Sequence, residues 1–533
     1  MKHLVFLTLN CSFSHSGMVL PMLHSACADL ENWQWHRVES TTDDDLSVVA
    51  SQIAALEPDL VCASCYLFNR REVLDVLGRL HALSPACRIA VGGPEALGEG
   101  AEKLLNYSFI HTVFRGEGET EFRTFLENGL PPGIFPVDGN GVFEDWAECS
   151  LSVADEFFRT DKPFVQVETS RGCPMGCAYC TSGGTQLRLK PLERVREELT
   201  LLHSKGVRDI RLLDRTFNLP YERSCALLKM FREEFPDIHF HLEIHPQFLN
   251  DELKKELSSA KPGQLHLEAG IQTLDENVQQ LIGRKSPPDK ALEGLRFLCN
   301  TGRFETHADL LAGLPGQTLK SLFKDIDTLL EVSPAEIQLE VLKILPGTPL
   351  KQQTEEFGII YAPEPPYDVM KTSCMTTADI LEARLASRLL DLLANHAVLH
   401  GVLQTMYREN PQVFPALLTF FKERGLELRR LYSLQSRFAM LQEFLTEDYP
   451  ESRKALAYAW LDAGYAPGEG AALAAEKLHA FPEELPVPEG FHDKVAEKES
   501  RCYRIYDRLY VFNRRYSMNL PMFFIVAKKG GMP

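Results

Sequence analysis

Strand-length apolar runs alternate with helix-length segments in two stretches of the chain, residues 1–125 and 164–344. This alternation predicts βαβ units, which build parallel sheets covered by helices. In the first stretch we expect strands at Leu4–Leu9, Trp35–Val38, Leu60–Ala63, Ile89–Val91 and Thr112–Phe114. In the second we expect them at Phe164–Glu168, Ile210–Leu213, His239–Ile244, Gln264–Ala269, Thr306–Ala312 and Ile337–Ile344. The chain is therefore predicted to be an α/β protein.

Domain boundaries follow from where this alternation stops. Residues 1–130 predict a doubly wound parallel sheet, which binds ligands beyond the carboxyl ends of its strands. Residues 131–160 begin with a Pro- and Gly-rich segment and are expected to be a linker. A second α/β domain is expected over residues 161–350, and a mainly helical domain over residues 351–533. Its expected helices are Ile380–Leu393, Val413–Glu423, Ser436–Leu445 and Ser452–Ala463, and Pro521–Ala527 predicts a last strand.

Three cysteines follow the first strand of the second stretch, in a turn that also contains Gly and Pro: Cys173, Cys177 and Cys180. Their Cys-x3-Cys-x2-Cys spacing lets three thiolates converge, and thiolates hold iron–sulfur clusters. Three ligands on a four-iron cluster would leave one iron open. The alternatives are a structural zinc site or three ordinary buried thiols. Structural zinc takes four ligands, usually in paired arms, and the next cysteine is Cys225.

Composition restricts partners and compartment. A formal net charge of -18 argues against a large phosphate-binding surface, so we expect no nucleic-acid partner. The basic and aromatic segment Arg501–Arg515 could be a ligand surface, although a strand edge with solvated arginines is favoured. Thirteen cysteines without framework spacing indicate a reducing compartment. The run Leu4–Leu9 is too short for a signal peptide, and no run approaches the ~18 apolar residues that span a bilayer. We expect a cytoplasmic protein without a membrane partner.

The cysteine spacing, with the aromatic Tyr179 directly before the last cysteine, resembles the signature of the radical S-adenosylmethionine (SAM) superfamily. The resemblance implies a partial (β/α)6 barrel, with a [4Fe-4S] cluster on Cys173, Cys177 and Cys180. SAM would chelate the open iron and yield a 5′-deoxyadenosyl radical on reductive cleavage. The resemblance also implies a partner protein that donates electrons to the cluster, such as flavodoxin or ferredoxin.

The ends of the N-terminal strands carry small and polar residues that, ahead of such a core, resemble the cobalamin-binding domain of cobalamin-dependent radical SAM proteins. The cobalamin contacts implied are Asn10, Ser64, Gly92, Gly93, Gly116 and Glu117. Many cobalamin proteins supply a cobalt-ligating histidine from an Asp-x-His-x-x-Gly motif, which is absent here. His15 lies in the corresponding loop, but Ser12 and Ser14 stand where that motif has Asp and His. We expect cobalamin without a protein histidine on cobalt. A doubly wound domain with another ligand, or none, is the alternative.

SAM contacts are implied at the carboxyl ends of the barrel strands: Tyr179, Asp214, Glu243, Glu268 and Gln272. Asp214 stands where the superfamily often has Gly-Gly-Glu, which is missing here. Polar residues at strand ends can instead be solvated or bond their own loop.

The family resemblance implies a methyltransferase. After the radical abstracts hydrogen from a small-molecule or peptide substrate, methylcobalamin would give its methyl group to an unactivated carbon or a similarly poor nucleophile. A non-methylating radical rearrangement or oxidation, and a cobalamin- or SAM-sensing binding protein, are the other interpretations. The helical region resembles a C-terminal extension, of unassigned role, in a subset of the family. It could cover the barrel mouth or be only a packed helical domain.

Overall fold

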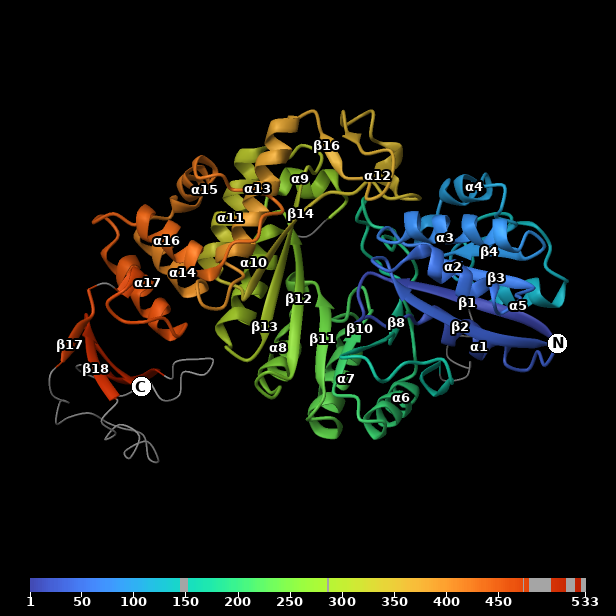
Figure 1. Cartoon of the computed structure of the whole chain (residues 1–533), viewed down its shortest axis with the longest axis horizontal. Helices are drawn as coiled ribbons and strands as arrows, with labels where there is room; N and C mark the ends of the chain where they lie inside the picture. Colours follow the sequence, from blue (N-terminus) through green and yellow to red (C-terminus); the bar gives the residue numbers. More distant parts are fainter. Residues whose placement is uncertain (144–151, 285–286, 473, 479–499, 514–522, 529–533) are drawn as a thin grey trace. The chain divides into compact units, whose positions relative to one another are not determined.

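The computed structural model describes residues 1–143, 152–284, 287–472, 474–478, 500–513 and 523–528 (Figure 1). The chain divides into two compact units. The first contains Met1–Ser321 and Glu340–Ile380, and the second contains Leu322–Leu339 and Leu381–Pro533. In the described part of the chain, no helix combines the length and the apolar character needed to cross a membrane.

The N-terminal sheet has six parallel strands in the order β2-β1-β3-β4-β5-β6. The strands are β1 (Lys2–Asn10), β2 (Trp33–Thr41), β3 (Leu60–Ser64), β4 (Arg88–Gly92), β5 (Thr112–Phe114) and β6 (Gly133–Phe135). The helices are α1 (Val19–Cys27), α2 (Leu46–Ala54), α3 (Arg70–Leu83), α4 (Gly100–Leu105) and α5 (Glu119–Glu127). β6 lies within the segment expected to be a linker and extends the sheet by one strand.

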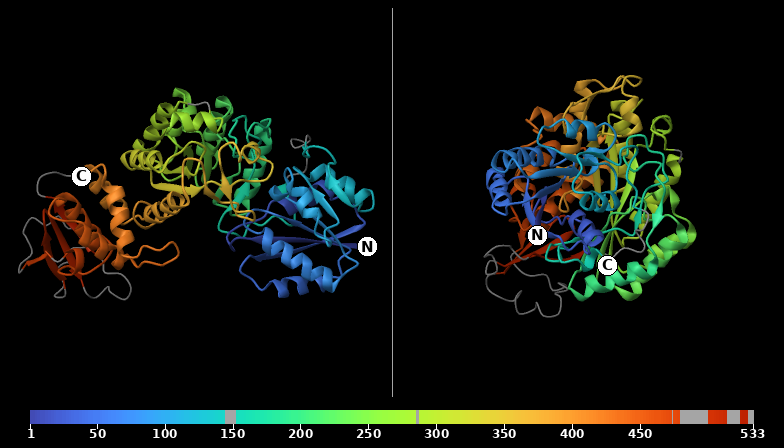
Figure 2. Two further views of the ribbon diagram at one scale, coloured as in Figure 1. Left: turned by 90° about the horizontal axis from the view of Figure 1, so that it is seen from above. Right: turned by 90° about the vertical axis from the view of Figure 1, so that its right-hand side faces the viewer.

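Both faces of this sheet are covered, as the doubly wound prediction requires. Val5 and Leu7 of β1 belong to one apolar core, and Leu4 and Phe6 belong to a second core. This happens because successive strand residues point to opposite faces. Figure 2 shows helices on both sides of the blue strands. Because the strand order reverses between β1 and β3, a crevice is expected at their carboxyl ends.

The second sheet also has six strands, in the order β14-β13-β12-β11-β10-β7. The strands are β7 (Val165–Val167), β10 (Asp209–Leu212), β11 (His239–Ile244), β12 (Leu265–Gln272), β13 (Glu305–Ala312) and β14 (Glu336–Val341). The helices are α6 (Leu192–Ser204), α7 (Tyr221–Glu234), α8 (Asp251–Ser258), α9 (Glu276–Leu281), α10 (Pro288–Asn300) and α11 (Leu319–Val332). The predicted six-stranded, barrel-type sheet is confirmed. A short antiparallel pair, β8 (Ser170–Arg171) with β9 (Arg188–Leu189), flanks the cysteine loop.

The alternation along β11 and β12 separates an apolar face from a polar one. Phe240, Leu242 and Ile244 are buried, whereas the residues between them, His241 and Glu243, are partly exposed. β12 repeats this pattern over its whole length. The polar face of the sheet is therefore the one available to a ligand.

The C-terminal region is mainly helical, as predicted, and ends in a sheet. Its helices are α13 (Thr377–Leu393), α14 (His400–Glu409), α15 (Val413–Glu423), α16 (Leu434–Phe444) and α17 (Pro450–Asp462). An antiparallel sheet follows, with β17 (Glu476–Leu478), β18 (Ser500–Ile505), β19 (Arg508–Asn513) and β20 (Phe523–Lys528) in that order. β20 corresponds to the predicted last strand, whose first two residues lie outside the described residues. The basic and aromatic segment forms the β18–β19 hairpin, and its Arg514 and Arg515 also lie outside them.

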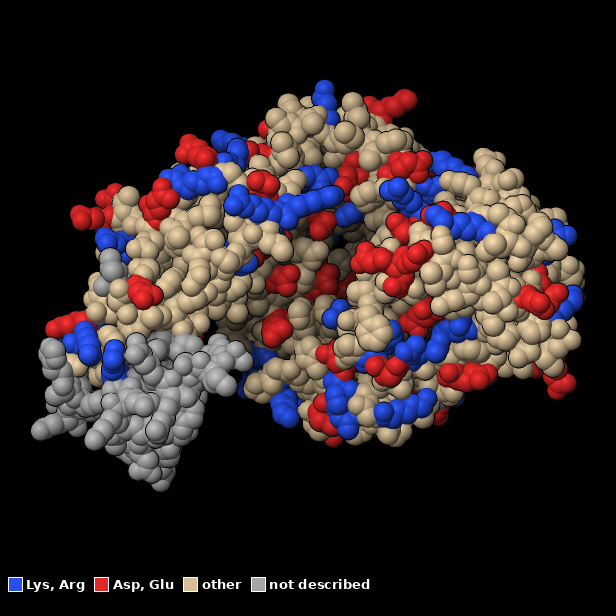
Figure 3. Space-filling model, viewed as in Figure 1, with Lys and Arg blue, Asp and Glu red and all other residues tan. Residues whose placement is uncertain are grey.

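Charges of both signs are interspersed over the described residues on the face in Figure 3. Basic side chains on that face have acidic neighbours, and no broad basic surface forms among them.

Candidate cofactor-binding site

The cysteine loop leaves the short strand β8 and is held by close backbone packing. Cys173 and Cys177 are buried and Cys180 is partly exposed. Gly172 has a φ of +86°, and a Cβ at this position would lie 2.0 Å from the carbonyl oxygen of Gln186. Only glycine therefore fits directly before Cys173. In the described part of the chain, no three His, Cys, Asp or Glu side chains are placed to hold a single metal ion.

Hydroxyl groups accompany the first cysteine. The backbone N–H of Cys173 donates to Thr185 Oγ1 at 3.0 Å, and Cys173 Sγ lies 3.3 Å from Thr216 Oγ1. The loop closes where the N–H of Gly183 donates to the carbonyl of Cys180 at 3.2 Å. Three thiols in one hydrogen-bonded loop, with no fourth cysteine beside them in sequence, are a donor set suited to a cluster with one open iron.

Asp214 anchors the start of this loop. Its carboxylate, 2% exposed, accepts the N–H groups of Thr169 at 2.6 Å and Ser170 at 3.0 Å. It also accepts the Thr169 hydroxyl at 2.5 Å. Because both carboxylate oxygens are occupied by the loop, Asp214 supports the segment before Cys173 and offers SAM no unoccupied oxygen.

Two adjoining cavities lie at the carboxyl ends of the N-terminal strands, with volumes of about 330 and 400 Å³. They share five lining residues: Phe6, Val19, Ser64, Leu213 and Arg215. All six residues expected to contact cobalamin line one or both: Asn10, Ser64, Gly92, Gly93, Gly116 and Glu117. The first cavity is also lined by Ser170, Arg171 and Gly172, directly before Cys173. A ligand that fills it therefore lies beside the cysteine loop.

The glycines of this edge serve the backbone as well as the cavity. A Cβ on Gly93 would lie 2.7 Å from the carbonyl oxygen of Cys65, and one on Gly116 would lie 2.7 Å from the backbone of Gly141. Gly92 differs, because a Cβ there would lie 3.3 Å from the Cβ of Phe114, a tight contact that a shift of a few tenths of an ångström would relieve. Gly92 and Ser64 thus keep space open at the sheet edge, which fits a bulky ligand.

His15 lines the second cavity, as its loop position suggested. Its Nδ1 lies 2.9 Å from Ser12 Oγ. Its ring packs edge-on against the ring of Phe164, with 5.4 Å between the two ring centroids. Burial, together with the charges of Arg211 and Lys162, lowers the pKa of His15, which disfavours the charged imidazolium.

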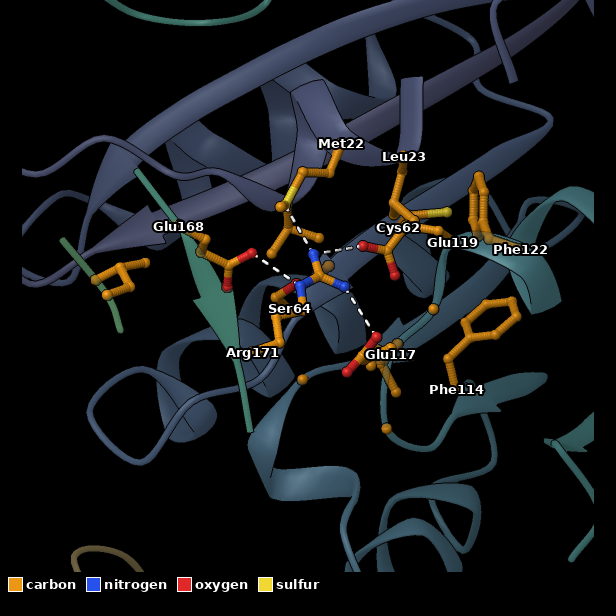
Figure 4. A pocket seen from close by; sticks show the side chains of 18 of the residues that line it. Met22, Leu23, Cys62, Ser64, Phe114, Glu117, Glu119, Phe122, Glu168 and Arg171 are labelled. Carbon is orange, nitrogen blue, oxygen red and sulfur yellow. Dashed lines mark hydrogen bonds and ion pairs between the residues drawn. The ribbon is translucent and has the colours of Figure 1, made fainter. Parts of the chain in front are cut away.

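Three glutamates surround the guanidinium of Arg171 (Figure 4): Glu117, Glu119 and Glu168. Glu117, predicted as a cofactor contact, also accepts bonds from Arg188 and from the N–H of Phe143. Burial would raise the pKa of Glu117, but the Arg188 hydrogen bond and the Arg171 charge together lower it. Sequence reasoning missed Arg171, because it lies more than fifty residues from Glu117 and Glu119.

Three of the predicted SAM contacts, Glu243, Glu268 and Gln272, lie on strands of the barrel-type sheet. Glu243 lies opposite Glu268, whose Oε2 is 2.9 Å from His241 Nε2. Burial, opposed by Arg215 and supported by Glu268, raises the pKa of Glu243 to about 7. Gln272 ends β12 at a register shift, with a φ of +68° that non-glycine residues rarely adopt. Such backbone outliers cluster at functional sites.

Arg284 is a buried cation beside the cysteines that sequence reasoning also missed. It is 7% exposed and donates to Tyr179 Oη at 3.3 Å and to the Gly270 carbonyl at 2.8 Å. No carboxylate in the described part of the chain pairs with it. Burial and this guanidinium lower the pKa of the neighbouring His245 to about 3. A buried charge needs a partner, so the site fits an anionic ligand group.

Comparisons with known proteins agree with this architecture. The model of the radical SAM superfamily matches residues 167–329, and a family described as a protein of unknown function (DUF4080) matches residues 355–462. An uncharacterized methyltransferase, PH0819, of Pyrococcus horikoshii is 25% identical over 58% of this chain and 72% of its own length. The cobalamin-dependent radical SAM methyltransferase TokK of Streptomyces tokunonensis is 23% identical, and the match spans only 51% of TokK.

Two solved structures share the fold. The radical SAM methyltransferase TsrM of Kitasatospora setae, with cobalamin and a [4Fe-4S] cluster bound, aligns with a TM-score of 0.55. It is 16% identical, and the alignment covers 87% of this chain and 96% of TsrM. The cobalamin-dependent enzyme OxsB, with aqua-cobalamin bound, aligns with a TM-score of 0.58 at 13% identity over 89% of this chain and 83% of OxsB. Residues 167–329 therefore match the radical SAM superfamily, and the chain shares the fold of these two solved structures.

Proposed function

We propose that the protein is a cobalamin-dependent radical SAM methyltransferase. It methylates an unactivated carbon, or a comparably poor nucleophile, of a small-molecule or peptide substrate, with electrons from a flavodoxin- or ferredoxin-type donor. The observation that carries the proposal is the first cavity, whose walls come from the N-terminal strand ends on one side and from Ser170, Arg171 and Gly172 on the other. A corrinoid in that cavity would adjoin the cluster loop.

Cys173, Cys177 and Cys180 would hold the cluster, since they are the three thiols of one hydrogen-bonded loop. Thr216 Oγ1 donates to the Arg215 carbonyl at 2.7 Å and lies 3.3 Å from Cys173 Sγ, so rotation of its hydroxyl would let it donate to the ligating sulfur instead. Hydrogen bonds to ligand sulfurs tune the reduction potential of such clusters.

Arg284 would bind the methionyl carboxylate of SAM. SAM at the open iron brings a carboxylate close to the cysteine loop, and Arg284 is the buried cation there without a carboxylate partner in the described residues. A hydrogen bond from a guanidinium to a carboxylate is roughly twice as strong as a neutral one. Tyr179 would orient the guanidinium, while Glu243, Glu268 and Gln272 offer acceptors for the amine or the ribose hydroxyls.

Bound cobalamin would supply the methyl group, and the cluster with SAM would supply the radical. The chain contributes orientation and exclusion of water. Asn10, Ser64 and Gly92 form the small and polar edge that receives the corrinoid. The absence of the Asp-x-His-x-x-Gly motif supports a cobalt without a histidine ligand; Ser12 Oγ contacts His15 Nδ1, which leaves Nε2 as the ring nitrogen that the test below must exclude as a ligand.

The proposal can be tested without knowing the substrate. Reconstituted and reduced protein is supplied with SAM carrying an isotopic label in its methyl group. We expect label in the corrinoid fraction together with S-adenosylhomocysteine, and 5′-deoxyadenosine from cluster-dependent cleavage. Cys173→Ala should lose the deoxyadenosine and retain cobalt. Deoxyadenosine without label transfer would favour a non-methylating reaction, and no cleavage at all would favour a sensor.

A further inference from the structure

Arg171 uses all three nitrogens of its guanidinium on carboxylates from different elements. Nη1 donates to Glu117 at 2.9 Å and Nη2 donates to Glu119 at 2.8 Å. Nε donates to Glu168 at 2.9 Å. Glu117 precedes helix α5 and Glu119 is its first residue, whereas Glu168 follows β7 of the second sheet. One side chain therefore joins the two sheets of the first unit.

The setting makes these contacts geometrically demanding. The Arg171 side chain is 9% exposed and that of Glu119 is 8% exposed, so the charges are removed from water. Buried ion pairs repay their desolvation only when the geometry is excellent. The planar fork of an arginine meets that demand, and the point charge of a lysine cannot. A small shift of the N-terminal sheet against β8 would break these bonds.

The position of Arg171 in the chain links this joint to the cluster ligands. Only Gly172 separates it from Cys173, and the backbone of Gly172 is fixed by its contact with Gln186. On the other side, Glu117 and Glu119 line the first cavity together with Gly92 and Gly93. The guanidinium in Figure 4 lies among carboxylates that line the first cavity, and its residue stands two positions before Cys173.

We propose that Arg171 is a positioning residue that sets the distance between the cobalt and the cluster. This inference rests on the proposed function, because it assumes both groups on one chain. The substrate radical must meet the methyl group at near-attack distance, and a misplacement of about 1 Å can cost roughly 10²-fold in rate. A clamp with three carboxylates holds that distance against rotation of either sheet.

The variants must separate the clamp from the cost of a buried charge. Arg171→Met alone would strand the buried Glu119, so the main variant is Arg171→Met with Glu119→Gln. Arg171→Lys keeps the positive charge but loses the planar guanidinium and its fixed N–H donors. The control is Arg123→Met. Arg123 lies in α5, as Glu119 does, and its replacement removes a bidentate pair with Asp29, at 2.6 and 2.7 Å, inside the N-terminal domain.

The readout is the magnetic dipolar interaction between cobalt(II) and the reduced cluster, measured by electron paramagnetic resonance on loaded protein without substrate. We expect iron and cobalt contents equal to wild type in all variants. The dipolar splitting should be weakened or broadened in the double variant, intermediate in Arg171→Lys, and unchanged in Arg123→Met. With substrate, methylated product per deoxyadenosine should fall by about 10²-fold in the double variant.

Two results would overturn the inference: a double variant with the wild-type splitting, or an Arg123→Met control that changes it equally. Failure of the proposed function is distinguishable, because wild-type protein would then take up no cobalt or no iron, or would transfer no methyl label to the corrinoid. The inference would fall with it.

Discussion

Asp214→Ala should destabilise the start of the cysteine loop without any ligand being involved. The carboxylate accepts two backbone N–H groups, from Thr169 and Ser170, which are 0% and 5% exposed. Each buried donor left unsatisfied costs about 1–3 kcal/mol, so the pair predicts a loss of about 2–6 kcal/mol. That is a large part of the roughly 5–15 kcal/mol that stabilises a domain.

Asp214→Asn should cost far less. Oδ1 accepts both backbone N–H groups in the structure, and the amide oxygen of asparagine can keep both bonds. Its NH2 group can donate to the Thr169 hydroxyl, so mainly the charge assistance is lost, about 1 kcal/mol. As a control, Asp45→Ala removes an exposed helix cap that accepts two backbone N–H groups, at a cost of about 1 kcal/mol.

The assay is urea unfolding of the cofactor-free protein, followed by iron uptake on reconstitution. The unfolding midpoint should fall strongly for Asp214→Ala and slightly for Asp214→Asn and Asp45→Ala. Iron per chain should fall only in Asp214→Ala. If both Asp214 variants keep wild-type stability and iron but lose SAM binding, Asp214 contacts SAM and the structural reasoning is refuted.

Three further perturbations test the site. Arg284→Met should weaken equilibrium binding of SAM to cluster-loaded protein about 10- to 100-fold, because a charged hydrogen bond contributes about 1.5–3 kcal/mol; unchanged affinity would contradict its role. Burial raises the pKa of Glu243 from 4.5 to about 7 in the folded protein, because the protonated carboxyl is the form that the buried site favours. Its contribution to the stability of the fold is therefore full below pH 4.5, where it is protonated in both states, and is lost as the pH rises through 7. The melting temperature of Glu243→Gln minus that of wild type should therefore be larger at about pH 8 than at about pH 5. An equal difference at the two pH values would count against this reasoning. The cobalt(II) resonance of cobalamin-loaded protein should lack nitrogen superhyperfine splitting; splitting that disappears in His15→Ala would show a histidine ligand.

The sheets could be predicted because their central strands are apolar runs bounded by turns. Leu60–Ser64 of β3 and Arg88–Gly92 of β4 show this pattern, with mostly buried side chains. β8 and β9 could not be predicted. Ser170–Arg171 and Arg188–Leu189 are short and mainly polar, so their pairing has no apolar pattern in the sequence to indicate it.

The candidate site was predictable where it depends on strand ends. Ser64 and Gly92 end neighbouring strands β3 and β4, and the carboxyl ends of parallel strands meet at one edge. Asp214 shows the limit, because a carboxylate at a strand end looks the same in sequence whether it meets a ligand or its own loop. Arg284 could not be predicted as part of the site either, because its hydrogen-bond partner Tyr179 lies 105 residues away in the sequence.

The metal content of the anaerobically reconstituted protein tests the central claim most directly. Wild-type protein should contain about four irons and about one cobalt per chain. The triple variant of Cys173, Cys177 and Cys180 to alanine should lose the iron and keep the cobalt, because the cavity for the corrinoid is formed mainly by the N-terminal strand ends. Wild-type protein that binds no cobalt, or a triple variant that keeps its cluster iron, would contradict the account.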